Sequence, residues 1–327
     1  MRATGARPDS APVVLYIAGC GRSGSTLLDR MLGQADGVIA VGELAQLWLP
    51  GELDKLVCGC GEPVRTCPLW SQVADRAYGG WDTADFATAV RLRTAVTRHR
   101  QLPLLVVPWI APRFKADSRR FADVVRRTYA AISEVSGCSV VVDSSKEVAF
   151  AYVLVTARQP GLRLLHLVRN GNGVAHSWTK EVAKPEVGNP DARLAQYKPA
   201  RMAARWVGYN TLVDLLRLSR VPLLVLRYET LVQHPRERLA GVLRHAGLDV
   251  HADDMTFVRD GQVHLAPAHT VAGNPMRFKD GALGLRVDEA WRTKMSRRDR
   301  RIVTVIASPV LARFGYVGRR RRTAVLP

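Results

Sequence analysis

A glycine-rich turn between a predicted strand and a predicted helix restricts the fold of this chain more than any other feature. The apolar run VVLYIAG (13–19) predicts a buried strand, and a helical pattern extends from about Ser25 to Gln34. Between them, GCGRSGST (19–26) fits the phosphate-binding pattern G-x-x-x-x-G-K-[ST], except that Ser25 stands where the lysine belongs. In such a turn the backbone N–H groups point at an anion, aided by the N-terminus of the following helix. We therefore expect this loop to bind a phosphate group.

Three further apolar runs are each followed by a helical pattern. They are SVVVDSSK (139–146), LRLLHLVRN (162–170) and VPLLVLRYE (221–229). Continuous apolar runs that alternate with helices are typical of a parallel sheet buried on both faces. The sequence thus predicts an α/β fold: a P-loop-containing parallel β-sheet flanked by helices in three layers (α/β/α), with helical insertions. Polar residues at the carboxyl ends of the strands would line one common crevice.

The length of 327 residues allows one large α/β domain or two small ones. No internal repeat or low-complexity linker divides the chain. We therefore predict a single domain over residues 1–327, with a core of about 11–315 and a basic tail at 316–327. The proline-containing stretch LPLLVVPWIAP (102–112) interrupts an otherwise helical region between Asp82 and Ser136.

The chain carries 48 lysines and arginines against 29 aspartates and glutamates, a net charge of +19. This excess favours anionic partners: nucleotides, acidic substrates, nucleic acid or a membrane surface. The run RRRR (319–322) is interpreted as a solvated tail rather than a binding patch. No opening segment has the order of a secretory signal, and the apolar runs are shorter than the roughly 18 residues of a membrane span. We expect a cytoplasmic protein.

The stretch CGCGEPVRTCPLW places Cys58, Cys60 and Cys67 within ten residues. The odd total of five cysteines, with no export signal, argues against a disulfide framework. A closed zinc site needs four ligands, usually with C-x₂₋₄-C spacings, and neither the spacing nor a fourth ligand is evident. We therefore favour a small loop punctuated by glycine and proline, without a metal. Zinc binding and pairing of these thiols are left open.

A second candidate anion site follows the predicted strand at 162–170. Arg169 ends this strand, and Ser177 lies eight residues later, about two turns into the next helix. A guanidinium and a hydroxyl brought together in this way form a phosphate site. In the first loop, Arg22 supplies positive charge from a position different from that of the missing lysine. The two sites together predict a nucleotide that bears two separate phosphate groups.

These stretches resemble the motifs of sulfotransferases that use 3′-phosphoadenylyl sulfate (PAPS). GRSGST is similar to the family's P-[KR]-S-G-[ST]-T, with Gly21 in place of the proline. Arg169, Asn170 and Ser177 match R-[DN]-x-x-x-x-x-x-S. LRYETLVQHP resembles YEDL…P, with Thr230 in place of the aspartate, and GNPMRFKDG resembles the basic loop that closes over the donor.

The similarity runs from about residue 13 to 295 and is closer to bacterial and tyrosylprotein-type members than to cytosolic phenol sulfotransferases. It implies three groups of donor-binding residues. On the 5′-phosphosulfate these are Arg22 and the backbone amides of Ser23, Gly24, Ser25 and Thr26. On the 3′-phosphate they are Arg169, Ser177 and Arg277, with Lys279 as the alternative to Arg277. The residue implied to contact adenine is Tyr228. PAPS has no β/γ-phosphate pair and needs no metal for transfer, which accounts for the missing lysine.

The resemblance also implies catalytic roles. Glu43, in VGEL, matches the general base of tyrosylprotein-type and related bacterial enzymes, and would take the acceptor's proton. Lys146 ends a predicted strand near the leaving phosphate, where a cation would stabilise charge on the bridging oxygen. Arg22 is assigned to catalysis as well as to donor binding. Asp143 is expected to orient Lys146 or to cap the next helix.

The predicted function is therefore transfer of a sulfuryl group from PAPS to a hydroxyl or amine of a small molecule, glycan or lipid. The insertions at 48–136 and 180–200 are expected to form the acceptor pocket. The stretch 102–112 is expected to contact an apolar acceptor or to form a lid, or else to be a buried connector. We expect no nucleic-acid partner, leave peripheral contact with an anionic membrane open, and predict no oligomeric state.

Two alternatives remain at this stage. The first is a metal-dependent P-loop kinase, because SVVVD (139–143) imitates a strand that ends in a Mg²⁺-binding aspartate. The second is a non-enzymatic basic protein that binds nucleic acid or a lipid surface, which the net charge supports. The lysine missing from the first loop and the site at Arg169 and Ser177 both count against the kinase.

Overall fold

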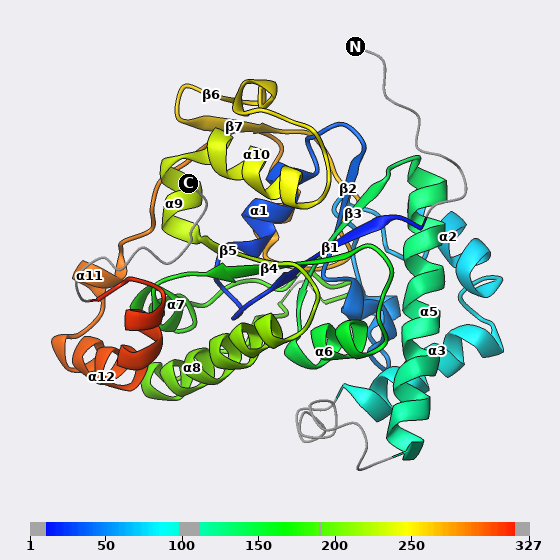
Figure 1. The fold of residues 1–327 in the computed structure, drawn as a ribbon, viewed down its shortest axis with the longest axis horizontal. Coiled ribbons are helices and arrows are strands. Elements are labelled where there is room, and N and C mark those ends of the chain that lie inside the picture. The colour runs from blue at the N-terminus through cyan, green and yellow to red at the C-terminus, as the bar shows by residue number, and fades with distance from the viewer. Residues whose placement is uncertain (1–10, 98–111, 190, 318–327) are drawn as a thin grey trace.

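A five-stranded parallel sheet forms the centre of the molecule (Figure 1). The structure, a computed structural model, describes residues 11–97, 112–189 and 191–317. The strands are β1 (Val13–Ala18), β2 (Val38–Gly42), β3 (Val140–Lys146), β4 (Leu162–Val168) and β5 (Leu223–Arg227). Their order is β2-β3-β1-β4-β5, and all four pairings are parallel. This confirms the predicted parallel sheet.

β1 lies between β3 and β4 and is buried on both faces. Val14 and Tyr16 belong to one apolar cluster, whereas Leu15 and Ile17 belong to another on the opposite face. Alternate side chains of a strand point to opposite faces, so a strand covered on both sides needs apolar residues at every position. This explains why the run has no polar alternation.

The first of the two helical layers lies above the sheet in Figure 1. It consists of α1 (Ser25–Leu32), α9 (Tyr228–Gln233) and α10 (Pro235–His245). A small antiparallel sheet extends this layer, with strands β6 (Val258–Arg259), β7 (Gln262–Leu265) and β8 (Gly281–Gly284). The apolar side chains of these elements share one core cluster with Leu15 and Ile17.

The second layer lies below the sheet (Figure 1). It contains α6 (Val148–Thr156), α7 (Gly171–Ser177), α8 (Pro199–Leu215), α11 (Trp291–Lys294) and α12 (Arg297–Arg313). Beside β2 and β3, α5 (Pro112–Ser136) packs against α2 (Pro68–Tyr78) and α3 (Ala84–Val96). Short 3₁₀ helices are η1 (Leu44–Trp48), η2 (Leu53–Lys55), η5 (Leu216–Leu218), η6 (Ala252–Asp254) and η7 (Pro275–Phe278). The three-layer arrangement with a helical insertion is confirmed.

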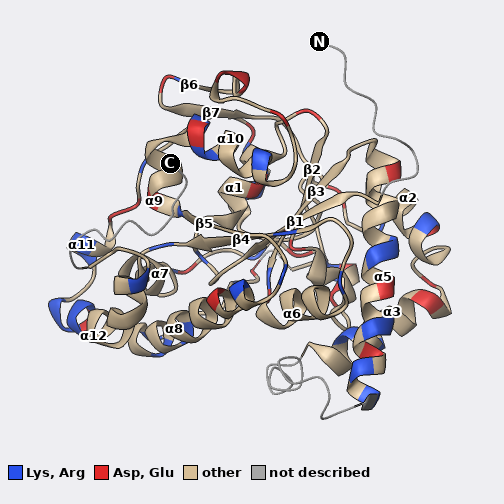
Figure 2. Ribbon diagram, in the orientation of Figure 1, with Lys and Arg blue, Asp and Glu red and all other residues tan. Residues whose placement is uncertain are grey.

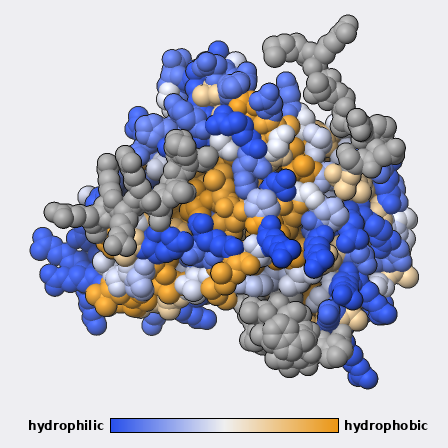
Figure 3. Space-filling view, viewed as in Figure 1, coloured by the Kyte–Doolittle hydropathy of each residue, from blue (hydrophilic) through white to orange (hydrophobic). Residues whose placement is uncertain are grey.

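The surface is strongly polar. Lysines and arginines lie on many helices rather than in one patch (Figure 2). Hydrophilic side chains cover most of the face in Figure 3, with apolar ones near its centre, between the helices above and below the sheet. None of the helices in the described ranges combines the length and apolarity that a membrane span requires. The arginine run 319–322 lies outside the described residues, as does 102–112 except for Pro112, where α5 begins.

Candidate active site

The turn between β1 and α1 contains two glycines that no larger residue could replace without strain. Gly19 has a φ of +148°, and a Cβ there would lie 2.4 Å from the carbonyl oxygen of Leu167 on β4. Gly24 has a φ of +91°, and its Cβ would lie 2.4 Å from the ring of Tyr228. Glycine adopts such φ values readily and lets the backbone approach closely. The turn is therefore packed tightly against β4 and α9 just before α1 begins at Ser25.

A cavity of about 640 Å³ opens beside this turn, at the carboxyl ends of the central strands. Of the residues predicted to bind donor or to act in catalysis, all but Ser23 line it: Arg22, Gly24, Ser25, Thr26, Glu43, Lys146, Arg169, Ser177, Tyr228 and Arg277. Ser23 is buried behind the turn. Residues predicted from motifs far apart in the sequence thus meet in one cavity.

Glu43 and Lys146 form an ion pair in the wall of this cavity. Lys146 Nζ lies 2.6 Å from Glu43 Oε1 and also donates to the carbonyl oxygen of Ser144 at 2.8 Å. Lys146 has a φ of +64°, and the register between β1 and β3 shifts just before it pairs with Ala18. This local distortion places the ammonium group beside the glycine turn. The pair brings the predicted base and the predicted cation into direct contact.

Arg22 presents an unused hydrogen-bond donor to the site. Its guanidinium lies over the ring of Trp178, 5.1 Å from the ring centroid, and Trp178 Nε1 donates to the carbonyl oxygen of Gly21 at 3.1 Å. Arg22 Nη2 and Ser23 Oγ are buried without a hydrogen-bond partner among the described residues. Burial lowers the pKa of Arg22, and the nearby carboxylate of Glu43 opposes that shift. Unpaired buried donors of this kind are suited to an anionic ligand.

Arg169 joins the glycine turn to a carboxylate that the sequence analysis did not identify. Its Nη1 donates to the carbonyl oxygen of Arg22 at 3.0 Å, and its Nη2 lies 3.0 Å from Oδ2 of Asp288. The guanidinium also lies 4.7 Å from the ring centroid of Tyr228. Asp288 therefore occupies one side of the predicted 3′-phosphate site. No local pattern around Asp288 predicts this contact.

The segment of residues 270–278, here called the late loop, forms the opposite wall. The N–H of Asn274 donates to Thr26 Oγ1 at 3.3 Å, so the late loop touches the glycine turn. Arg277 is 2% exposed, and its two Nη atoms donate to the carbonyl oxygens of Thr270 (2.8 Å) and Val57 (2.7 Å). Burial lowers its pKa to about 10.

Arg277 thus lines the cavity while it braces the late loop. Lys279, the alternative to Arg277, is exposed and is not among the residues that line the cavity. The predicted contact between Arg277 and a 3′-phosphate stays a prediction.

Asp143 does not have either role expected of it. It is fully buried, accepts from the Tyr129 hydroxyl at 2.7 Å and from the Ser145 N–H at 2.8 Å, and burial raises its pKa to about 6. Among the described residues it forms no hydrogen bond with Lys146, and α6 begins without a side-chain cap. The expectation was wrong because β3 turns Asp143 into the core. Ser145, its partner, accepts from the N–H of Ala45 and so supports the segment after Glu43.

Both predicted insertions reach the same cavity. Glu52, Lys55 and Leu56 come from 48–136, and Lys184, Pro185, Glu186 and Leu194 come from 180–200. Lys184 Nζ links the two insertions, because it lies 3.2 Å from Glu52 Oε2 and also pairs with Glu186. This end of the cavity therefore combines charges of both signs with a few apolar side chains.

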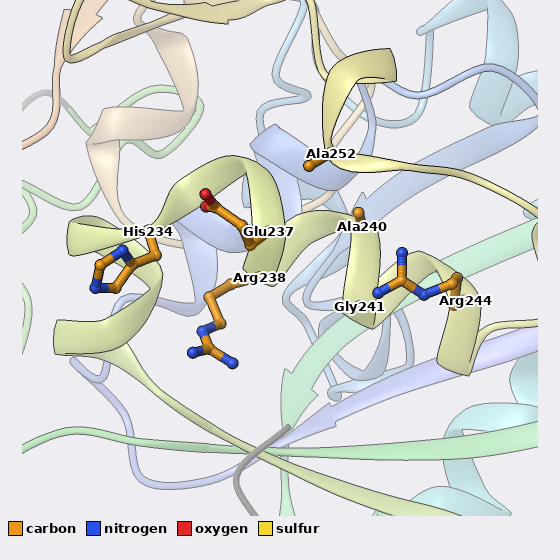
Figure 4. Close-up of a pocket in the computed structure, with 7 residues that line it drawn as sticks. All are labelled: His234, Glu237, Arg238, Ala240, Gly241, Arg244 and Ala252. Atoms are coloured by element: carbon orange, nitrogen blue, oxygen red, sulfur yellow. The ribbon is translucent and has the colours of Figure 1, made fainter. Parts of the chain in front are cut away.

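A second, smaller cavity of about 380 Å³ lies on α10 (Figure 4). Its lining residues are His234, Glu237, Arg238, Ala240, Gly241, Arg244 and Ala252. None of the residues predicted to bind donor or acceptor is among them. The chemistry predicted from the sequence thus belongs to the larger cavity.

The sequence matches the sulfotransferase family model over residues 12–253. The chain belongs to the sulfotransferase family. The match covers more than half of the chain and includes both predicted phosphate motifs, and it ends before the late loop. No curated protein sequence matches the chain.

Two solved structures that are similar to this chain are described as sulfotransferases. The sulfotransferase domain from the Synechococcus PCC 7002 olefin synthase is 19% identical, with a TM-score of 0.45 over 97% of this chain and 100% of that one. The sulfotransferase from Alicyclobacillus acidocaldarius is 14% identical, with a TM-score of 0.43 over 94% of this chain and 96% of that one.

Proposed function

We propose that this protein transfers a sulfuryl group from PAPS to a hydroxyl or amine of a small molecule, glycan or lipid. One observation carries the proposal. Two arginines from separate strand ends, Arg22 and Arg169, line one cavity with Tyr228 between the glycine turn and Arg169. Two cations beside an aromatic ring suit a nucleotide that carries phosphate groups at both the 5′ and the 3′ position of its ribose.

The glycine turn fits the 5′-phosphosulfate. The buried and unpaired Arg22 Nη2 belongs to a residue that lines the cavity, and it is a donor that an anion there would satisfy. The backbone amides of the turn and the first turn of α1 add further donors. Arg22 and these amides therefore hold the group to be transferred, and the missing P-loop lysine is not needed.

Arg169 and Ser177 hold the 3′-phosphate in this proposal. Both line the cavity, and the planar guanidinium of Arg169 can meet a phosphate with two parallel hydrogen bonds. Asp288 holds Arg169 in place at 3.0 Å before the phosphate binds. A carboxylate repels a phosphate. When the donor binds, Arg169 Nη2 must therefore either release Asp288 and bind the phosphate, or donate to both.

Glu43 and Lys146 carry out the proton and charge steps of the proposed reaction. PAPS supplies the sulfuryl group and leaves as 3′,5′-ADP. Glu43 accepts the proton of the acceptor hydroxyl as its oxygen forms the new bond to sulfur. Lys146 stabilises the negative charge that develops on the phosphate oxygen as the old S–O bond breaks. Their 2.6 Å ion pair places the proton acceptor directly beside the cation before the reaction.

The kinase alternative fits the structure less well. Its Mg²⁺ would need Asp143 at the nucleotide, but this residue is fully buried, bonded to Tyr129 and Ser145, and does not line the cavity. In this proposal the acceptor binds at the end of the cavity that residues of both predicted insertions line. The mixed charges there favour an acceptor that carries polar groups beside the reacting hydroxyl or amine.

Calorimetry in buffer without Mg²⁺ tests the donor assignment. We expect 3′,5′-ADP to bind at least about tenfold more tightly than AMP or ADP, because the 3′-phosphate adds charged hydrogen bonds worth roughly 1.5–3 kcal/mol each. Equal affinity for AMP would overturn the assignment. With binding established, a screen of phenols, sugars, glycolipids and tyrosine peptides with radiolabelled PAPS identifies the acceptor.

A further inference from the structure

Four potential metal ligands from two distant segments meet beside the cavity. They are the Sγ atoms of Cys58, Cys60 and Cys67 and the Nδ1 atom of His269, all within 4.8 Å of one another. Cys67 Sγ lies 3.6 Å from Cys58 Sγ and 3.8 Å from Cys60 Sγ. His269 Nδ1 lies 3.3 Å from Cys67 Sγ and 3.7 Å from Cys58 Sγ. The fold supplies the fourth ligand that the spacing of the cysteines does not reveal.

We propose that Cys58, Cys60, Cys67 and His269 bind a structural zinc ion. With Zn–S bonds of about 2.3 Å and a Zn–N bond of about 2.0–2.1 Å, tetrahedral coordination separates two sulfurs by about 3.8 Å and a sulfur from a nitrogen by about 3.6 Å. The four distances given above, 3.3–3.8 Å, lie within about 0.3 Å of these values. Three thiolates and an imidazole in this geometry are typical of zinc.

A disulfide does not account for the cluster. An S–S bond is about 2.05 Å long, whereas the sulfurs here are 3.6 and 3.8 Å apart. All five cysteines lie in the described part of the chain, and all are free. The thiols are thus spaced for a shared ion and not for a bond to one another.

The surroundings of the cluster suit a closed site. Cys58 and Cys67 are fully buried, and Cys67 directly precedes α2, whose positive N-terminal end favours a thiolate. The indole N–H of Trp70 donates to the carbonyl oxygen of His269 at 2.9 Å and so holds the histidine segment in place. Because all four positions are occupied by protein ligands, the ion has no open position for a substrate.

The charge of the site is balanced by Arg277. Zinc with three thiolates and a neutral imidazole carries a net charge of −1. The Arg277 guanidinium donates to Val57, the residue before Cys58, and to Thr270, the residue after His269. The same arginine therefore spans both halves of the cluster and offsets the negative charge at its edge.

The zinc ion would join the segment of residues 57–70 to the late loop. The N–H of Gly59 donates to the carbonyl oxygen of Thr270 at 2.8 Å, so the two segments are already paired at this point. Further along the late loop, Gly273 approaches Thr26 and Glu43. The ion thus holds one wall of the cavity in place without taking part in transfer, and this inference does not depend on the identity of the donor.

Metal analysis of the full-length chain, purified without a metal-affinity step, tests the proposal. We expect about one zinc ion per chain by mass spectrometry of the metals. Replacement by Co²⁺ should produce thiolate-to-cobalt charge-transfer bands and the d–d spectrum of a tetrahedral ion. Iron in place of zinc, or a chain that holds no zinc both as purified and after incubation with Zn²⁺, would overturn the assignment.

Variants separate the cluster from other thiols. Cys60→Ser changes the exposed ligand and leaves the core intact, so we expect a folded protein that loses its zinc to a chelator far faster than the unmodified chain. Cys138→Ser is the matched control, because Cys138 lies outside the cluster. This variant protein should keep its zinc. If Cys67→Ser or His269→Ala fails to fold, release of zinc from the unmodified chain by a thiol-modifying reagent gives the same information. Equal zinc retention in Cys60→Ser and Cys138→Ser contradicts the proposal.

Discussion

The two walls of the large cavity are built in different ways. One wall, here called the strand-end wall, consists of the β1–α1 turn, Lys146 at the end of β3 and Arg169 directly after β4, all at the centre of the sheet. The other is the late loop, which precedes β8 and is held by contacts with segments about 200 residues earlier, such as the Gly59–Thr270 hydrogen bond. The strand-end wall is placed by the core, whereas the late loop is placed by a few long-range contacts.

The difference separates binding from stability. Side chains at the ends of buried strands can change without loss of the sheet beneath them, so their variants should mainly affect ligands. A loop that depends on a few contacts should lose its position, and part of the fold, when one is removed. Each of the following experiments tests one side of this comparison.

The largest effect is expected at Glu43, which lies between the two walls. Glu43→Gln keeps the shape of the side chain and removes the proton acceptor, so kcat on a hydroxyl acceptor should fall by about 10²–10⁴-fold. Affinity for 3′,5′-ADP by calorimetry should be nearly unchanged. Glu134→Gln, at an exposed ion pair with Arg76, is the control. Near-normal kcat in Glu43→Gln would show that the base lies elsewhere.

Arg277→Ala tests the late loop. The substitution removes the donor to the Val57 carbonyl oxygen and the packing on Phe278, so we expect a loss of about 2–4 kcal/mol in the free energy of unfolding by urea. Binding of AMP and of 3′,5′-ADP should weaken by similar factors, because the wall moves as a whole. A loss confined to 3′,5′-ADP, with unchanged stability, would instead make Arg277 a direct ligand of the 3′-phosphate.

Arg169→Ala tests the strand-end wall. We expect 3′,5′-ADP to bind about 10–100-fold more weakly, from the loss of charged hydrogen bonds worth roughly 1.5–3 kcal/mol, in a chain that remains folded. Affinity for AMP, which lacks the 3′-phosphate, should change much less. Arg76→Ala removes an exposed arginine and serves as the charge-matched control. Should the variant unfold while its folded fraction binds 3′,5′-ADP normally, Arg169 has a structural role only.

A pair of glycine substitutions gives the smallest expected difference. Gly51 has a φ of +70°, and a Cβ there would meet no atom of the described residues within 4 Å apart from its chain neighbours. Gly51→Ala therefore measures backbone strain alone, about 1–2 kcal/mol. Gly24→Ala adds the contact with the Tyr228 ring and should cost about 1–3 kcal/mol more in urea unfolding. It should also weaken 3′,5′-ADP binding. Equal costs for the two variants would show that the turn is not packed against α9.

The strand-end wall was largely predictable from local sequence. A buried parallel strand requires a continuous apolar run, and a phosphate turn requires glycine at set positions, so both leave short patterns around Gly24 and Arg169. The sheet then brings the strand ends together, because parallel strands point their carboxyl ends the same way. The contact between Glu43 and Lys146 follows from this geometry.

Other residues of the site left no such pattern. Trp178, next to the predicted Ser177, contacts Arg22 only because α7 packs beside the turn. Asp288 and His269 are single polar residues in irregular segments. From the sequence alone, many other carboxylates could have paired with Arg169, and other histidines could have joined the cysteines. Asp143 follows an apolar strand as a metal-binding aspartate would, yet β3 directs it into the core.

Local pattern was enough for four strands of the sheet, for the glycine turn and for the positions of Arg22 and Arg169, because hydrogen bonding and burial restrict neighbouring residues within a few positions of one another. β2 (Val38–Gly42) was not among the predicted strands. The late loop and the cysteine–histidine cluster depend on which distant segments the packed layers bring together. His269 lies more than 200 residues from Cys58 and Cys67, and only the folded chain places its Nδ1 atom within 4 Å of their sulfurs. Contacts over such separations arise from the packing of the whole molecule, which no short stretch of sequence specifies.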